Sequence, residues 1–95
     1  MKTQLITLTE YCNSNKIEST FIHSLMEEGL VEVQVISGEE FIDTEQMPTL
    51  EQYARWHYEM KINPGGIDAL QHMLNKIRNL QKEINYLKSR LHLYE

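Results

Sequence analysis

The side chains best suited to catalysis or metal binding are four histidines and a single cysteine: His23, His57, His72, His92 and Cys12. Imidazole and thiolate groups bind zinc or act as nucleophiles when several of them are held at suitable spacing. Here no histidine lies in an HExxH motif, and no second cysteine completes a CxxC pair. We therefore expect ordinary histidines, a buried thiol, no metal, no cofactor and no enzymatic activity.

Charge is distributed unevenly along the chain, whose 95 residues carry a net charge of −5. Residues 1–50 contain two basic and nine acidic side chains, whereas residues 51–95 contain seven basic and five acidic ones. The first half is therefore near −7 and the second near +2. A strongly acidic surface repels phosphates and attracts basic partners, so the first half is poorly suited to nucleic acid.

The acidic side chains cluster around the expected end of the second helix and the expected β-wing. The set comprises Glu27, Glu28, Glu32, Glu39 and Glu40. One interpretation is a solvated face, and the other is a docking surface for a basic helix or patch. The near absence of basic residues across fifty positions favours docking, so we predict that these five residues contact a partner.

An aromatic cluster lies between residues 53 and 58. Tyr53, Trp56 and His57 share one face of the expected helix, a spacing typical of a core. Tyr58 lies off that face, and a large amphipathic ring in such a position suits an interface. We predict that Tyr58 is an exposed anchor for the partner.

The elements that position these side chains begin with a short strand, Gln4–Leu8. Thr9 is the expected N-cap of a short helix that spans Glu10–Ser14. A second helix is predicted from Glu18 or Ser19 to Glu28, with one apolar face. Gly29 should end it, because glycine tolerates the positive φ that helix C-termini require.

The middle of the chain predicts a β-wing followed by a third helix. Partial alternation over Val31–Ile36 indicates a strand, and Ser37-Gly38-Glu39 is typical of a hairpin turn. The segment from Glu40 to Ile42 is the expected return strand. Pro48 suits the first turn of the third helix.

The last third of the chain predicts one long helix, with Asn63 as N-cap and Pro64 as the first helical residue. Apolar side chains recur there at heptad spacing: Leu70, Ile77, Ile84 and Leu91 at one position, and Met73, Leu80, Leu87 and Tyr94 at the other. This stripe needs a second helix to cover it, so we predict a coiled-coil homodimer. Leu74, an extra apolar residue beside the stripe, indicates that the start of this helix packs on the globular part.

The order of these motifs resembles the MerR-like helix-turn-helix fold and, within it, the chaperone-modulator proteins of the CbpM type. The residues that carry the resemblance are Leu8 to Cys12, Glu28 to Val31, Phe41, Asn63 to Ile67, and Leu80, Glu83, Leu87 and Leu91. The resemblance implies a mainly α fold with a small β-wing, in which a winged helix-turn-helix precedes a long dimerisation helix. It also implies binding to the J-domain of a DnaJ-like co-chaperone and inhibition of its stimulation of Hsp70.

The chain departs from the MerR pattern where DNA would be contacted. MerR-type regulators commonly carry an arginine in the second helix and another in the wing. The corresponding positions here offer His23 in the helix, and Glu39 and Glu40 in the wing. A MerR-like transcription regulator that binds DNA is therefore the alternative hypothesis, and inhibition of the co-chaperone is the leading one.

We expect one compact unit, with a helix-turn-helix, wing and third helix over residues 1–62 and a long helix over residues 63–95. No stretch approaches the ~20 apolar residues of a membrane span. The N-terminus also lacks the basic region and long apolar run of a signal peptide. These features predict a cytoplasmic protein that does not bind a membrane.

Overall fold

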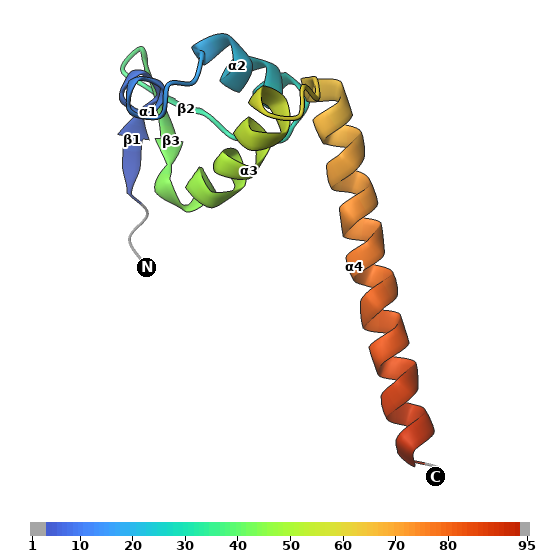
Figure 1. Cartoon of the computed structure of the whole chain (residues 1–95). Helices are drawn as coiled ribbons and strands as arrows, with labels where there is room; N and C mark the ends of the chain where they lie inside the picture. The colour runs from blue at the N-terminus through green and yellow to red at the C-terminus, as the bar shows by residue number, and fades with distance from the viewer. Residues whose placement is uncertain (1–3, 94–95) are drawn as a thin grey trace.

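The computed structural model describes residues 4–93, which form a small globular part and one long projecting helix (Figure 1). The elements follow in the order β1 (Leu5–Thr7), α1 (Leu8–Asn15), α2 (Ser19–Glu27), β2 (Gln34–Ile36), β3 (Glu39–Asp43), the 3-10 turn η1 (Thr44–Gln46), α3 (Met47–Tyr58) and α4 (Pro64–Leu93). This is the predicted winged helix-turn-helix with a long C-terminal helix, so the predicted fold class is confirmed.

The three strands form one antiparallel sheet in the order β1-β3-β2. Val35 pairs with Glu40 and Ile36 with Glu39, which leaves Ser37 and Gly38 as a two-residue turn. Both turn residues have positive φ, 52° and 80°, as the tight hairpin turn that matches strand twist requires. The predicted wing hairpin is therefore confirmed, but Glu39, which was predicted in the turn, is the first residue of the return strand. The pairing of β1 with the other edge of β3 was not predicted.

The first helix begins two residues earlier than the sequence suggested, and the prediction of Thr9 as its N-cap was wrong. Thr7 is the cap: its backbone is extended, and its hydroxyl accepts a hydrogen bond from the Glu10 N–H at 3.1 Å. Thr9 already lies inside the helix, which continues through Asn15 rather than ending at Ser14. A helix needs its cap just outside the first turn, and Thr7 holds that position.

The strand predicted over residues 31–36 is also shorter than expected, because it begins at Gln34. Val31 is buried and belongs to the core instead of the sheet. The backbone N–H and C=O of Glu32 both bond the side chain of Gln46, at 2.9 Å each. These groups are thereby withheld from a strand ladder, so β2 begins only after residue 33.

The end of α2 follows the prediction closely. Gly29 has a φ of 75°, and its N–H donates to the Met26 carbonyl at 3.0 Å. The Leu30 N–H donates to the Leu25 carbonyl at 2.9 Å. These two bonds form the Schellman motif, which satisfies the last carbonyls of the helix and turns the chain back.

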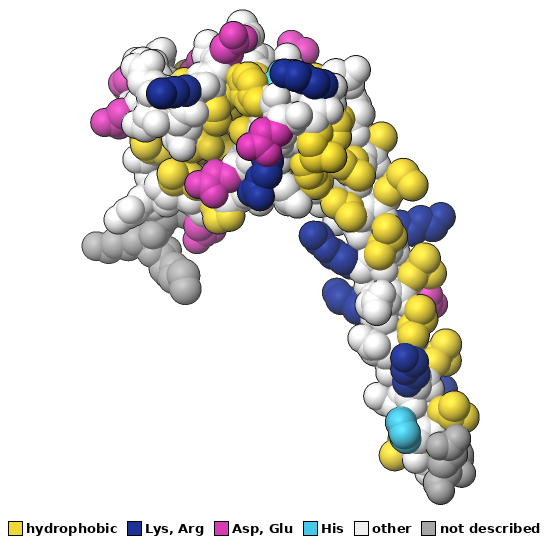
Figure 2. Space-filling view, in the orientation of Figure 1, with side chains coloured by type: hydrophobic (Ala, Val, Ile, Leu, Met, Phe, Trp, Pro, Cys, Tyr) yellow, Lys and Arg dark blue, Asp and Glu magenta, His cyan; other side chains and the backbone are white. Residues whose placement is uncertain are grey.

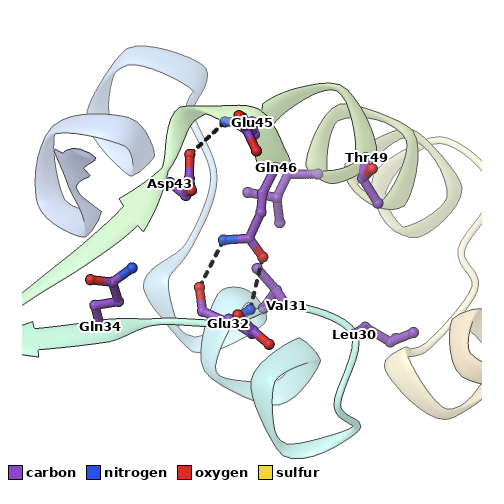
Figure 3. Close-up of a pocket in the computed structure, with 9 residues that line it drawn as sticks. Leu30, Val31, Glu32, Gln34, Asp43, Glu45, Gln46 and Thr49 are labelled. Atoms are coloured by element: carbon purple, nitrogen blue, oxygen red, sulfur yellow. Dashed lines mark hydrogen bonds between the residues drawn. The ribbon is translucent and has the colours of Figure 1, made fainter. Parts of the chain in front are cut away.

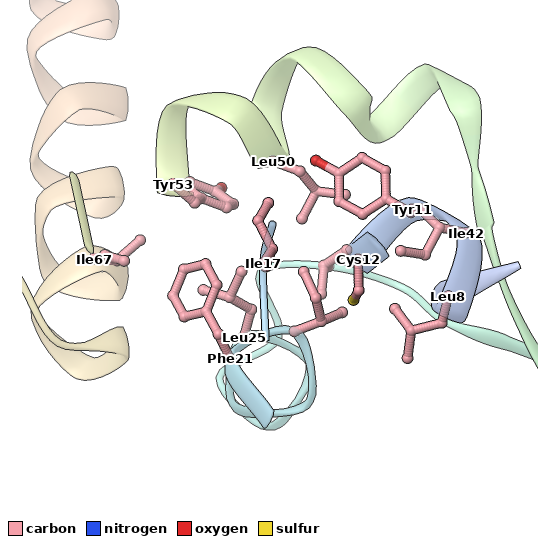
Figure 4. Close-up of a cluster of buried hydrophobic side chains, with 12 residues drawn as sticks. Leu8, Tyr11, Cys12, Ile17, Phe21, Leu25, Ile42, Leu50, Tyr53 and Ile67 are labelled. Atoms are coloured by element: carbon pink, nitrogen blue, oxygen red, sulfur yellow. The ribbon is translucent and has the colours of Figure 1, made fainter. Parts of the chain in front are cut away.

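The core lies where α1, α2, α3 and the sheet meet (Figure 4). Its fully buried side chains are Tyr11, Ile22, Leu25, Ile42, Leu50 and Ile67. Ile67 comes from the second turn of α4 and ties this helix to α2 and α3. Most of the rest of α4 extends away from the globular part.

The start of α4 confirms the predicted cap. The Asn63 Oδ1 accepts the Gly66 N–H at 2.7 Å, and Pro64 is the first helical residue. The helix has 30 residues, which corresponds to a length of about 45 Å. Within residues 4–93 no helix is long and apolar enough to cross a membrane.

Candidate functional site

The predicted acidic set is spread over the end of α2, the following loop and the wing. Glu27, Glu28, Glu32 and Glu39 are exposed, whereas Glu40 is half-buried. Two neighbours belong to the same acidic surface but were missed from the sequence: Asp43 at the end of β3 and Glu45 in η1. The acidic run from Glu39 to Glu45 could have indicated them.

Glu40 is held by a histidine of the helix-turn-helix. His23 Nε2 lies 3.0 Å from Glu40 Oε1 and 2.9 Å from Oε2, and this contact joins α2 to the wing. Both side chains are a little over one third exposed. Glu40 therefore fixes the wing against α2, and its carboxylate is less available to a partner than the sequence suggested. In addition, His23 Nε2 donates to the Glu40 carboxylate, so this N–H is not offered to a partner.

A hollow of about 400 Å³ lies between the loop after α2, the end of β3 and the start of α3 (Figure 3). Its acidic lining residues are Glu32, Asp43 and Glu45, and no Lys or Arg within residues 4–93 lines it. The Gln46 amide spans the hollow to the backbone of Glu32, as Figure 3 shows. The wing base is thus held in place at the centre of the acidic surface.

Tyr58 is exposed, as predicted, although only just over a third of its surface is free. Its hydroxyl accepts a hydrogen bond from the Glu18 N–H at 3.1 Å. Its ring meets Phe21 edge-on at a centroid distance of 5.5 Å, and His57 at 4.9 Å. Tyr58 therefore braces the start of α2 and keeps one part of its ring accessible.

A second hollow, of about 540 Å³, lies beside Tyr58, between the α1–α2 turn and the outer side of α3. Its apolar lining comes from Ile17, Ala54 and Tyr58. Charged residues of both signs also line it. On the face of the globular part that Figure 2 shows, acidic and basic side chains are interspersed among hydrophobic ones. We refer to this hollow as the Tyr58 groove.

Cys12 and His57 are placed as structural side chains. Burial raises the pKa of the Cys12 thiol, which disfavours the thiolate that a nucleophile needs. His57 Nδ1 lies 2.8 Å from the Ile62 carbonyl, so this nitrogen carries the proton. Across residues 4–93 no three His, Cys, Asp or Glu side chains gather in a possible metal site.

The predicted heptad stripe lies along one side of α4 and is uncovered (Figure 2). Leu70 and Leu74 are half-buried near the globular part. The other described members of the stripe, Met73, Ile77, Leu80, Ile84, Leu87 and Leu91, are 48–64 % exposed. Tyr94 lies outside the described residues. Large apolar side chains in such a row form a contiguous patch of the kind that marks an interaction surface.

One comparison with known proteins gives a match. A family model described as MerR HTH family regulatory protein matches residues 6–89, which is nearly the whole chain. No curated protein and no solved structure matches it. The matched range includes the helix-turn-helix, the wing, α3 and most of α4.

Proposed function

We propose that this chain, which belongs to the MerR family of helix-turn-helix regulatory proteins, regulates its target by binding a protein instead of DNA and without catalysing a reaction. The observation that carries the proposal is the chemistry of α2 and the wing. From Ser19 to Glu27, the helix contains no Lys or Arg. Its one histidine, His23, is bonded to Glu40, and Glu39 stands at the wing turn.

This surface is unfavourable for nucleic acid. Protein–DNA affinity draws largely on neutralised phosphates, and carboxylates at the contact surface oppose that contribution. The same carboxylates favour a protein with a basic face, because opposite potentials speed up encounter and fix orientation. The acidic hollow that contains Glu32, Asp43 and Glu45 supports this preference, since none of the described residues that line it is basic.

The partner that we propose is the J-domain of a DnaJ-like co-chaperone. The resemblance to chaperone modulators suggests it, and the acidic wing supports it because a basic domain surface is the complementary partner. Binding would block the J-domain from stimulating Hsp70. Glu27, Glu28, Glu32 and Glu39 would supply long-range attraction to that domain.

We further propose that the functional unit is a homodimer in which α4 pairs with α4 of a second copy. Six stripe residues that are about half or more exposed would be costly to leave in water, and burying apolar area contributes about 25 cal/mol per Å². The dimer would present two acidic wings, and therefore two sites for a J-domain.

The test is calorimetric titration of the full chain with an isolated J-domain, together with the Hsp70 ATPase rate. We expect one J-domain per chain, weaker affinity at higher salt, and loss of J-stimulated ATPase. The variant Glu27→Lys/Glu28→Lys should weaken binding several-fold, and most strongly at low salt. A stimulated ATPase rate that is unchanged at saturating protein would sink the proposal.

DNA binding is the competing function for a MerR-family chain. The discriminating measurement is retention on heparin or on a nonspecific duplex at low salt. We expect no retention, because α2, the helix that would contact the DNA bases, contains no Lys or Arg. Salt-sensitive retention that is lost on mutation of α2 would favour the transcription regulator.

A further inference from the structure

The Tyr58 groove shares no lining residue with the acidic hollow at the wing, and hydrogen bonds and ring packing hold both of its walls. Lys16 adopts a left-handed conformation with a φ of 55°, and the Ile17 N–H bonds the Cys12 carbonyl at 3.0 Å. Tyr58 is held on the other side by its bond to the Glu18 N–H and by its packing on Phe21. A partner would therefore bind without having to order the groove, which removes one of the usual costs of association.

The charges around the groove follow a helical repeat. Glu51 and Arg55 lie four residues apart on α3, and Glu59, the C-cap residue of this helix, follows four residues later, so the three form one ridge with alternating sign. All three are exposed. Within residues 4–93 the only ion pairs are His23 with Glu40 and Asp68 with His72, so the ridge charges are free to meet a partner.

The shape of the groove selects a helix as its occupant. One wall is helix α3 and the other is a helix–helix turn, so no sheet edge is available to pair with an extended peptide. A helix, in contrast, carries side chains on successive turns that repeat every ~6 Å, the spacing of the ridge. Its apolar stripe would lie on Ala54 and the Tyr58 ring.

We propose that the Tyr58 groove receives one amphipathic helix of the protein partner, with Lys or Arg facing Glu51 and Glu59 and an acidic residue facing Arg55. The contact face of the partner helix would therefore carry a basic, an acidic and a basic residue at four-residue spacing. This inference rests on the proposed function, because it specifies which part of the protein partner is gripped. The acidic wing attracts the partner from a distance, and the groove retains it.

The first experiment uses two synthetic stapled helical peptides that share one Leu/Ala stripe. One carries Lys, Glu and Lys at four-residue spacing, and the other carries Glu, Lys and Glu. We expect the full chain to prefer the first peptide by about tenfold, the order seen for close interfacial charge pairs. The swap Glu51→Lys/Arg55→Glu/Glu59→Lys should invert this preference. Glu83→Lys, at an exposed position on α4 that lines neither hollow, has the same net charge change and should leave it unaltered.

The second experiment measures association and dissociation rates with the isolated J-domain. The swap variant and Tyr58→Ala should increase the dissociation rate about tenfold, as loss of an interface anchor does. Tyr58→Phe keeps the ring but loses the hydroxyl that accepts from the Glu18 N–H, so it should increase the dissociation rate less than Tyr58→Ala does. Glu28→Lys should only slow association. Circular dichroism of each variant separates lost contact from lost fold, and the swap positions are exposed.

The outcomes separate the two proposals. Peptide preference that inverts with the swap, without any J-domain binding, supports the groove and overturns the co-chaperone assignment. If the J-domain binds, its dissociation rate is the same for the swap variant as for the wild type, and both peptides bind equally, then the groove proposal is overturned and the co-chaperone assignment is supported. If the chain prefers neither peptide and does not bind the J-domain, both proposals are overturned.

Discussion

The side chain of Gln46 bonds both backbone polar groups of Glu32. The Glu32 N–H donates to Gln46 Oε1 at 2.9 Å, and Gln46 Nε2 donates to the Glu32 carbonyl at 2.9 Å. The side chain of Gln46, in η1, therefore satisfies the backbone N–H and C=O of a loop residue that does not pair with a strand. This clamp sets where β2 begins and places the acidic residues around the hollow.

Replacing Gln46 with alanine should loosen the base of the wing. Both bonds are exposed to solvent, so we expect the free energy of unfolding to fall by only about 1 kcal/mol. The amide of Glu32 should exchange its hydrogen faster, as measured by NMR. Gln34→Ala is the matched control, since Gln34 lines the same hollow without a hydrogen bond from its side chain among the described residues. Equal exchange rates in the two variants would contradict the clamp.

Tyr11 should make the protein sensitive to alkali. Its hydroxyl is buried, has no hydrogen-bond partner among residues 4–93, and points toward Leu50 (Figure 4). Burial raises the pKa of Tyr11 above 10.0, and the nearby carboxylate of Glu51 raises it further. As the pH rises, Tyr11 therefore loses its proton in the unfolded chain before it does so in the folded protein. The free energy of unfolding falls once the pH rises through and above the pKa that Tyr11 has in the unfolded chain.

The measurement is a series of thermal melts between neutral and alkaline pH. Tyr11→Phe should match or exceed the wild type at neutral pH, because it removes a buried polar atom that has no partner. It should also lose less stability at alkaline pH. Burial likewise raises the pKa of Tyr53, so some alkaline loss should persist in the variant. A variant with the wild-type pH profile would exclude Tyr11 as a source of the sensitivity.

The features that the sequence predicted correctly depend on residues close together in the chain. Gly29 ends α2, Ser37 and Gly38 form the wing turn, and Asn63 caps α4 through contacts within five positions. Each of these signals acts through local backbone geometry. That locality is why the sequence alone predicts the order of elements.

The features that the sequence did not reveal join distant residues. Glu40 and His23 are 17 positions apart, and Tyr58 and Glu18 are 40 apart. Composition identified Glu40 as part of an acidic surface, but only the fold shows its carboxylate turned to α2. The Tyr58 groove could not be predicted either, because its two walls come from residues 15–17 and residues 51–59, which are far apart in the sequence.

Charges placed in the α4 stripe should dissociate the proposed dimer. Ile77 and Ile84 are 54 % and 48 % exposed in the single chain. Replacing both with Asp would therefore cost the monomer little, but it would bury unpaired carboxylates in the paired helix. We expect the mass in sedimentation to halve while the helix content of the globular part stays intact. Asn75→Asp/Ser89→Asp, on the opposite side of the helix, is the matched control. A double variant with unchanged mass would remove α4 as the dimer interface.

The two glycines at the start of α4 should respond in opposite directions to alanine. A Cβ on Gly66 would meet Ile62 Cγ2 at 2.8 Å and Asn63 Oδ1 at 3.2 Å. Ile62 packs against the core, so it has little room to withdraw. The clash would also disturb the bond between Asn63 and the Gly66 N–H. Gly66→Ala should therefore destabilise the protein and loosen the junction of α4.

Gly65 is the internal control, because its added Cβ would find only Asn63 Oδ1 at 3.5 Å, an ordinary contact. Gly65→Ala should raise the free energy of unfolding by about 0.5–1 kcal/mol, since alanine favours the helix and restricts the unfolded chain. Urea denaturation of the two variants beside the wild type measures both effects. If both variants gained stability, the close packing at Gly66 would not be the reason that a glycine stands there. The opposite signs would show that one glycine is required by contact and its neighbour is not.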